Sequence, residues 1–169
     1  LQGRLRELSF LNKGICIKLI DEVTDKTAEF KADGGLLSFV EFLNRSKTAI
    51  HPKPLYVQTE KDNCAVEVAL QWNDGYSESV FSYTNNINTV EGGTHLTGFR
   101  SALTRVVNSL ATDDKGAQSL KEGLSADDIR EGLTAVLSVK IPDPQFEGQT
   151  KSKLGNSRVR TVVESILNE

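Results

Sequence analysis

Residues 55–84, LYVQTEKDNCAVEVALQWNDGYSESVFSYT, decide the fold because apolar and polar positions alternate between two turn signals, KDN and NDG. Alternation of this kind is typical of half-buried strands, and we predict strands at residues 55–60, 64–72 and 78–84. In the middle strand, Val66 and Val68 share one face, whereas Glu67 and Gln71 share the other. The short turns predict an antiparallel meander, and the polar second face predicts helices on one face only.

Helices and further strands surround this segment. Apolar residues at helical spacing predict helices over residues 1–13, 36–43, 94–111, 126–133 and 156–169. Ser125 is expected to cap the fourth of these helices. Further strands are predicted at residues 15–20, 27–31 and 133–141, the last being the apolar run LTAVLSVKI. Residues 112–123 are polar and predict a surface loop. The order α-β-β-α-β-β-β-α-α-β-α predicts an α+β sandwich with helices packed over one sheet.

Composition limits the possible function classes. The chain has 169 residues, a net charge of −3 and a hydrophobic content of 38%, which fits one globular domain. Because the chain is slightly acidic, any contact with DNA needs a local basic surface. No apolar run is long enough to span a bilayer, and the few cysteines and histidines make no zinc pattern. Cys16 and Cys64 are expected to be buried free thiols in a reducing cytoplasm, although a disulfide between them is left open.

A loop at residues 141–151, IPDPQFEGQTK, carries the strongest functional signal. Two prolines, an aspartate and a glycine keep the loop out of helix and strand. The strand before it and an N-cap pair, Asn156-Ser157, after it are expected to fix both of its ends. Its tip, Gln149-Thr150-Lys151, offers an amide, a hydroxyl and an ammonium group, which together suit a terminal phosphate. Taken alone, the triplet is better explained as an exposed loop with one solvated lysine.

Other polar residues have simpler explanations. Arg100 borders the apolar stripe of the helix at 94–111, and its stem is expected to cover the core while its charged end reaches water. His95 stands at the start of the same helix, where a structural role is expected. Asp127 and Asp128 fall in the first turn of a helix, a position that favours acids without any metal. We therefore expect no metal site.

Three segments resemble the B subunits of bacterial DNA gyrase and their relatives, the type IIA topoisomerases. They are EVALQWNDG (67–75), TNNINTVEGGTHLTGFRSALTRVVNSL (84–110) and PDPQFEGQTKSKLGN (142–156), in the order found in the family. The resemblance extends over essentially the whole chain and points to the second domain of that subunit, the transducer domain. It implies a two-layer fold shared with a ribosomal protein, with a left-handed βαβ crossover that breaks the usual right-handed rule.

The resemblance also implies roles for particular residues. Lys151 is expected to reach into a neighbouring ATPase domain and act as a catalytic contact to the terminal phosphate of ATP, and Gln149 is expected to contact the same phosphate. Arg100 is expected to face the central cavity of the dimer, where it couples DNA passage to ATP hydrolysis. Nothing in the chain matches the family's ATP-binding motifs, acidic metal cluster or active-site tyrosine. ATP and magnesium are thus expected to bind mainly to absent domains, and the isolated chain is expected to be inactive.

Residues 1–169 are accordingly expected to form one transducer domain, with uncapped helices at 1–13 and 156–169 cut where they join absent neighbours. The complete enzyme is expected to be a cytoplasmic, ATP-dependent topoisomerase that supercoils DNA together with the gyrase A subunit. Its B subunits are expected to dimerise on ATP binding, without any membrane partner. Two alternatives are the equivalent subunit of topoisomerase IV and a free-standing nucleic-acid-binding module, the second of which the acidic charge disfavours.

Overall fold

The structure is a computed structural model that describes residues 1–113 and 123–169. Its elements are α1 (Gln2–Leu11), β1 (Cys16–Asp21), β2 (Lys26–Lys31), α2 (Leu36–Asn44), β3 (Leu55–Lys61), β4 (Cys64–Trp72), β5 (Ser79–Thr84), β6 (Ile87–Asn88), β7 (Gly92–Gly93), α3 (Thr94–Asp113), α4 (Ala126–Arg130), β8 (Leu133–Lys140), β9 (Lys153–Leu154) and α5 (Ser157–Asn168). Every helix and strand expected from the sequence is present, and β6, β7 and β9 are additional short strands. Of the expected loop at 112–123, residues 114–122 lie outside the described part of the chain.

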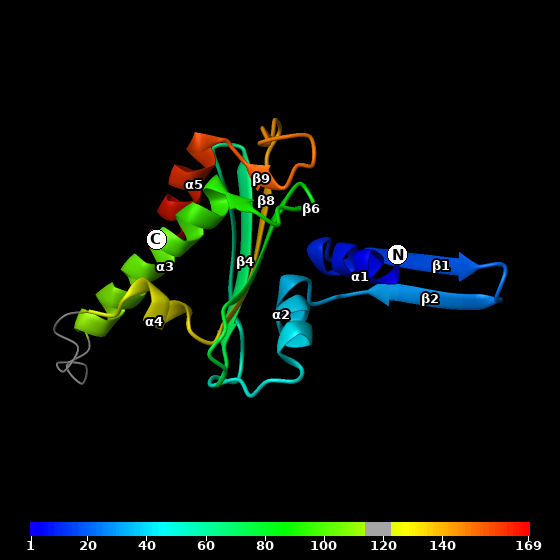
Figure 1. Cartoon of the computed structure of the whole chain (residues 1–169), viewed down its shortest axis with the longest axis horizontal. Coiled ribbons are helices and arrows are strands. Elements are labelled where there is room, and N and C mark those ends of the chain that lie inside the picture. Colours follow the sequence, from blue (N-terminus) through cyan, green and yellow to red (C-terminus); the bar gives the residue numbers. More distant parts are fainter. Residues whose placement is uncertain (114–122) are drawn as a thin grey trace.

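The main sheet has the strand order β3-β4-β8-β5-β6, which confirms the predicted α+β class with a mixed sheet (Figure 1). β8 pairs antiparallel with β4 and parallel with β5. The predicted meander of three consecutive strands is therefore wrong, because β8 lies between β4 and β5. Residues 133–139 of β8 are all buried, and an apolar run of this kind favours a central place in a sheet. The left hand of the crossover from β5 to β8 stays a prediction.

Helices cover both faces of the sheet, as Figure 1 shows. α3, α4 and α5 lie on one face, whereas α2 packs against β4 and β8 on the other, which corrects the expectation of helices on one face only. The core on the α2 side consists of Leu11, Leu36, Phe39, Val40, Ala69, Tyr83 and Val136. Gln71, expected on a polar face, is only 4% exposed, and its Oε1 accepts a hydrogen bond from Asn44 Nδ2 at 3.0 Å. Gln71 can thus be buried beneath α2 because the Asn44 amide provides a hydrogen-bond partner for its side chain.

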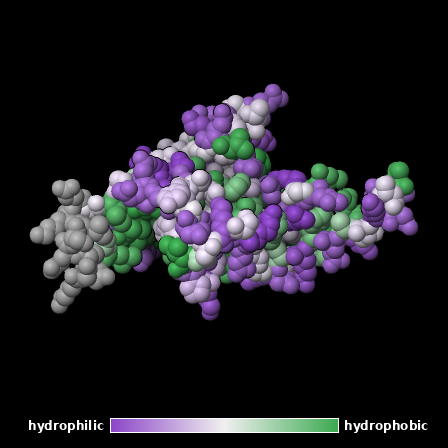
Figure 2. Space-filling view, turned by 60° about the horizontal axis from the view of Figure 1, so that its bottom comes forward, coloured by the Kyte–Doolittle hydropathy of each residue, from purple (hydrophilic) through white to green (hydrophobic). Residues whose placement is uncertain are grey.

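The N-terminal hairpin of β1 and β2 is a separate sheet that projects from the main body (Figure 1). α1 joins it to the body, where Phe10 stacks on Phe39 of α2 with ring centroids 4.8 Å apart. Figure 2 shows hydrophobic side chains on the surface at the far end of this hairpin, where Ile20 and Val23 are exposed. The far end of the hairpin therefore adds little to the core, and α1 provides its main attachment.

The composition led to two expectations: that the cysteines form no disulfide, and that no segment spans a membrane. Cys16 and Cys64 are both free thiols, which agrees with the expectation of no disulfide between them. Cys16 on β1 is exposed, however, and only Cys64 on β4 is buried as expected. In the described residues, no helix is both long enough and apolar enough to cross a membrane.

α3 and α5 approach each other closely at a glycine. A Cβ atom at Gly98 of α3 would lie 2.6 Å from the backbone oxygen of Arg160 in α5. Because the opposing atom belongs to the backbone, no side-chain rotation can relieve the overlap. The absence of a side chain at Gly98 therefore sets the distance between the two helices that cover the main core.

His95, at the start of α3, is fully buried. Its Nε2 lies 2.9 Å from Thr89 Oγ1, and this hydroxyl donates to the backbone oxygen of Ser82 at 2.9 Å. The tautomer with its proton on Nε2 fits this arrangement, because it leaves a lone pair and not an N–H unpaired at Nδ1. Nδ1 is buried and has no hydrogen-bond partner within the described residues. Burial lowers the pKa of His95 to about 4, so the ring is neutral at physiological pH, as a structural histidine should be.

We expect Gly98→Ala to lower the free energy of unfolding by about 1–3 kcal/mol, the usual cost of forcing extra volume into a packed contact. Gly3→Ala is the matched control, because Gly3 also lies in a helix and a Cβ atom there would meet nothing within 4 Å. The control should be neutral, or stabilising by up to about 1 kcal/mol through helix propensity. Urea unfolding measures both changes, and equal effects at the two positions would contradict a close contact at Gly98.

Stability should also fall in mild acid through His95. Its folded-state pKa lies below the value of 6.5 for an unperturbed histidine, so its contribution is complete above pH 6.5 and is lost as the pH falls towards 4. Linkage gives a loss of about 2 kcal/mol in the free energy of unfolding between pH 7 and pH 5. His95→Gln should lack this part of the pH dependence. The measurement is urea unfolding at both pH values, and an NMR titration that places His95 near its unperturbed pKa would refute the explanation.

Candidate functional site

A loop that folds back on itself follows β8 and carries the predicted tip. Glu147 N donates to Lys153 O at 2.9 Å, which closes the loop below its tip. β9, on the returning side, pairs in parallel with β7 and places Gly93 opposite Leu154. A Cβ atom at Gly93 would lie 2.4 Å from Leu154 O, so the close approach of two backbones explains this glycine without any bound anion.

Asn156 holds the base of the loop. We expected it to cap α5, and it does occupy the N-cap position, but its side chain makes no capping hydrogen bond. Instead, its Oδ1 accepts from Gln145 N at 2.7 Å, and its Nδ2 donates to Asp143 O at 3.1 Å. Both halves of the amide therefore fasten the loop backbone.

Glu91 holds the returning side of the loop. Its backbone N donates to Ser152 O at 3.0 Å, and its carboxylate accepts a hydrogen bond from the Ser152 hydroxyl. Sequence reasoning missed this role because the two residues are far apart in the chain and no motif joins them. The loop is thus anchored by Asn156 at its C-terminal end and by Glu91 from a distant segment.

The tip places Gln149, Thr150 and Lys151 together on the surface, and all three are exposed. Lys151 has a left-handed backbone conformation with a φ of 56°, which helps the chain to reverse direction. Thr150 Oγ1 lies 3.3 Å from Ser152 Oγ, so this hydroxyl contacts the loop itself. The amide and the ammonium group are left as the outward-facing polar groups of the tip.

The two lysines of the loop differ in their surroundings. Lys153 is half-buried, and its ammonium group lies 2.9 Å from the Glu147 carboxylate. The hydrogen bond that Lys153 donates to the Glu147 carboxylate raises the pKa of Lys153. Lys151, by contrast, forms no ion pair with any residue that the structure describes. A cation held out on an anchored loop without an internal partner is available to an external anion.

Arg100 is held by a carboxylate. Its Nε donates to Glu78 Oε1 at 3.1 Å, and its Nη2 lies 3.0 Å and 3.1 Å from the two carboxylate oxygens. This two-pronged pair explains the position of the side chain better than the expected snorkelling does. Arg100 lines a surface hollow of about 290 Å³ together with Lys153 and Arg160. Gln149 and Lys151 do not line it, so the two predicted sites do not share this hollow.

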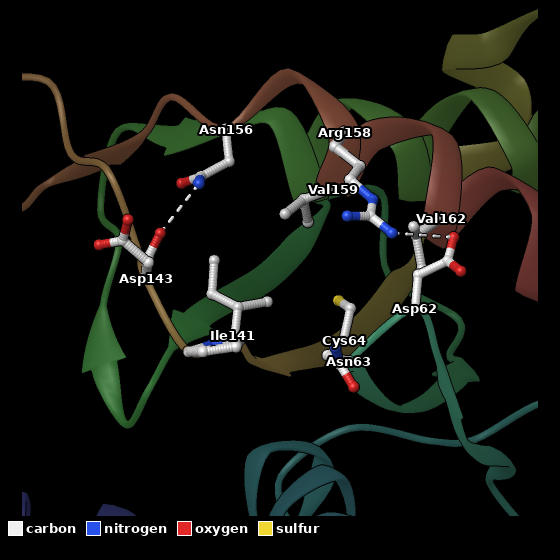
Figure 3. A pocket seen from close by; sticks show the side chains of 10 residues that line it. Asp62, Asn63, Cys64, Ile141, Asp143, Asn156, Arg158, Val159 and Val162 are labelled. Atoms are coloured by element: carbon white, nitrogen blue, oxygen red, sulfur yellow. Dashed lines mark hydrogen bonds and ion pairs between the residues drawn. The ribbon is translucent and has the colours of Figure 1, made fainter.

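A pocket of about 180 Å³ lies beside the base of the loop, between the β3–β4 turn and the start of α5 (Figure 3). Cys64, Ile141 and Val159 form apolar lining, and Arg158 Nη2 at the rim lies 3.5 Å from Asp62 Oδ2. Burial raises the pKa of the Cys64 thiol, which disfavours the reactive thiolate. No group of His, Cys, Asp and Glu side chains in the described residues could hold a metal ion. The pocket has room for a small apolar group but offers no catalytic set.

Comparison with protein families and curated proteins gives a consistent result. The family model described as DNA gyrase B matches residues 35–169. The chain is 57% identical to the B subunit of DNA gyrase from Clostridium acetobutylicum and 53% identical to that from Myxococcus xanthus. Both alignments cover the whole chain but only 27% and 21% of the two relatives. The chain thus spans about a quarter of the length of the curated relatives that it matches.

Solved structures agree with this result. The 43K ATPase domain of Thermus thermophilus gyrase B, in complex with an aminocoumarin, matches with a TM-score of 0.86 at 36% identity, over 99% of this chain and 45% of that chain. The ATP-binding domain of Francisella tularensis topoisomerase IV matches with a TM-score of 0.79, over 99% of this chain and 44% of that chain, but its 24% identity indicates a shared fold alone. On the extent of the family match, the chain belongs to the DNA gyrase B family.

Proposed function

We propose that this chain is the transducer part of a gyrase B subunit, which links the nucleotide state of a neighbouring ATPase domain to the passage of DNA. The observation that carries the proposal is Lys151, an unpaired cation among the described residues, presented on a loop that Asn156 and Glu91 anchor. Such a cation is available to an anion from outside the domain. The relatives that match the whole chain are gyrase B subunits, which supports the terminal phosphate of ATP as that anion.

Lys151 and Gln149 would act together on this phosphate. The Lys151 ammonium group donates to phosphate oxygens and stabilises the negative charge that develops on the transferred group. The Gln149 amide adds a neutral donor beside it. ATP and magnesium would be held mainly by the neighbouring ATPase domain, and the ion would stabilise negative charge on the phosphates. When the terminal phosphate leaves, Lys151 loses its partner, and its loop is no longer held towards the nucleotide.

The complete protein would then be a cytoplasmic, ATP-dependent type IIA topoisomerase that works with gyrase A on DNA and closes as a dimer of B subunits. Residues 1–169 would transmit the motion, whereas the chain alone would not hydrolyse ATP. Arg100 would face the transported DNA and meet its phosphates. Because Glu78 already binds Arg100, a DNA phosphate would have to share or replace that carboxylate.

The equivalent subunit of topoisomerase IV is the closest alternative, and the 57% identity to a gyrase protein favours gyrase. A supercoiling assay of the complete holoenzyme distinguishes the two. A free-standing nucleic-acid-binding module is disfavoured by the net charge of −3. Affinity of the isolated chain for RNA at physiological salt would support that module instead.

Lys151→Ala in the complete subunit should lower ATP turnover by about 100-fold, the scale seen when one donor to a developing charge is lost. Thr150→Ala is the matched control at the same tip and should keep turnover within about twofold, because its hydroxyl contacts the loop and removing an exposed group costs little. Lys151→Arg should restore turnover only in part, since a guanidinium differs from an ammonium in size and geometry. Steady-state ATPase assays measure all three. Wild-type turnover in Lys151→Ala would remove Lys151 from the mechanism.

Arg100→Gln should reduce DNA-stimulated ATP hydrolysis more than basal hydrolysis, because only the stimulated rate depends on a contact to DNA. Glu78→Gln is the matched control, because it removes the same ion pair and leaves the arginine charge in place. If Arg100 binds a DNA phosphate, Glu78→Gln keeps or strengthens stimulation, and stimulation falls steeply with salt. Equal losses of stimulation in the two variants would assign Arg100 a purely structural role in its ion pair.

A further inference from the structure

The turn between β5 and β6 contacts the root of the loop. This turn consists of Asn85 and Asn86, both with left-handed backbone conformations at φ values of 48° and 66°. Asparagine tolerates this conformation better than most residues and suits a tight turn of this kind. Asn85 N donates to Val139 O at 2.9 Å, which continues the pairing of β5 with β8 up to the turn.

The side chain of Asn85 binds the first residue after β8. Its Nδ2 donates to Ile141 O at 2.8 Å, and its Oδ1 accepts from Ile141 N at 2.9 Å. The amide therefore occupies both backbone groups of Ile141 at the point where the chain leaves the sheet. A neighbouring strand would otherwise satisfy these groups, so Asn85 replaces a strand at the root of the loop.

The turn itself is fixed from the other side by α1. Asn86 Nδ2 donates to Asn12 Oδ1 at 3.3 Å, and the Arg4 guanidinium donates to the backbone oxygen of Asn86. Asn12 ends α1 and also accepts from Lys140 Nζ at 3.3 Å. The turn that contains Asn85 is consequently held by contacts from α1, and these contacts do not depend on the loop or on α5.

We propose that Asn85 is a positioning residue for Lys151, an assignment that rests on the proposed contact of Lys151 with the nucleotide. Asn85 fixes the loop at Ile141, and Asn156 fixes it again at Asp143 and Gln145. With the root held at these points, the exposed tip can extend from the domain without losing its direction. The role differs from catalysis, because Asn85 acts through the backbone of the loop and touches no substrate.

Hydrogen–deuterium exchange of the complete subunit tests the positioning role directly. Asn85→Gly removes the side-chain clamp but keeps a residue that accepts a φ of 48°, so the turn should still form. Asn85→Asp keeps the acceptor for Ile141 N and loses the donor to Ile141 O. We expect Asn85→Gly to speed exchange at Ile141 and across residues 143–153 by about tenfold, the effect of losing a hydrogen bond of ordinary net strength. Asn85→Asp should show a smaller increase at the same residues.

Asn108 provides a matched control. It makes the same double contact elsewhere in the domain, because its Oδ1 accepts from Leu124 N at 2.7 Å and its Nδ2 donates to Leu124 O at 3.0 Å. Asn108→Gly should speed exchange near Leu124 and leave residues 143–153 unchanged. Unchanged exchange of residues 143–153 in Asn85→Gly would overturn the positioning role, as would an equal change there in Asn108→Gly.

ATP turnover of the same variants separates this inference from the proposed function. If Asn85 positions Lys151, Asn85→Gly lowers ATP turnover by about tenfold. The double variant with Lys151→Ala and Asn85→Gly then has the same ATP turnover as Lys151→Ala alone, because Asn85 acts only through Lys151. Faster exchange of the loop with normal turnover in Asn85→Gly, while Lys151→Ala is impaired, would overturn the role of Asn85 only. Normal turnover in Lys151→Ala would overturn the proposed function itself, and the exchange data would still report whether Asn85 holds the loop.

Discussion

The central place of β8 in the sheet is the constraint on which the rest of the structure depends. Residues 133–139 are buried throughout, and they contribute to the core beneath α3 and α5 as well as to the core beneath α2. The chain leaves the sheet at the end of this strand, so the loop that carries Lys151 starts from one of the best-buried parts of the domain. Movement of the loop relative to the sheet is therefore restricted at its root, where the chain leaves β8.

Much of the fold could be predicted because its signals are local. Apolar periodicity placed α2 and α3, turn residues placed the β3–β4 hairpin, and the capping box of Ser125 and Asp128 at α4 matches the expected N-cap. The order of the strands could not be predicted in this way, because the insertion of β8 between β4 and β5 depends on pairing between distant segments. The same limit explains why no helix was expected on the second face of the sheet: from the sequence Gln71 is expected to face solvent, and only the fold brings Asn44 to it.

Only part of the candidate site could be predicted from local sequence signals. The exposed tip with Gln149 and Lys151 follows from the loop signals, although its role with ATP stays a prediction. The contacts that hold this tip come from asparagine and glutamate side chains whose partners are backbone groups of other segments. An asparagine that clamps a distant loop has the same local sequence as an asparagine in any turn or cap, as Asn156 illustrates. Spacing alone could not distinguish these roles.

The two cations of the proposed mechanism would meet their anions under different conditions. Lys151 is exposed and unpaired among the described residues, so a phosphate that approaches it displaces only water. Arg100 already binds both oxygens of Glu78, and a DNA phosphate must compete with a carboxylate at 3.0 Å. Near a protein surface, two unit charges 4 Å apart attract by about 4 kcal/mol, and the costs of desolvation and of side-chain ordering offset most of this attraction. Replacing the carboxylate by a phosphate therefore changes the free energy of the Arg100 ion pair little. Lys151 should therefore respond to whether a phosphate is present, whereas Arg100 should respond to the position of Glu78. Glu78 immediately precedes β5, and the turn at the other end of β5 carries Asn85, which holds the loop of Lys151.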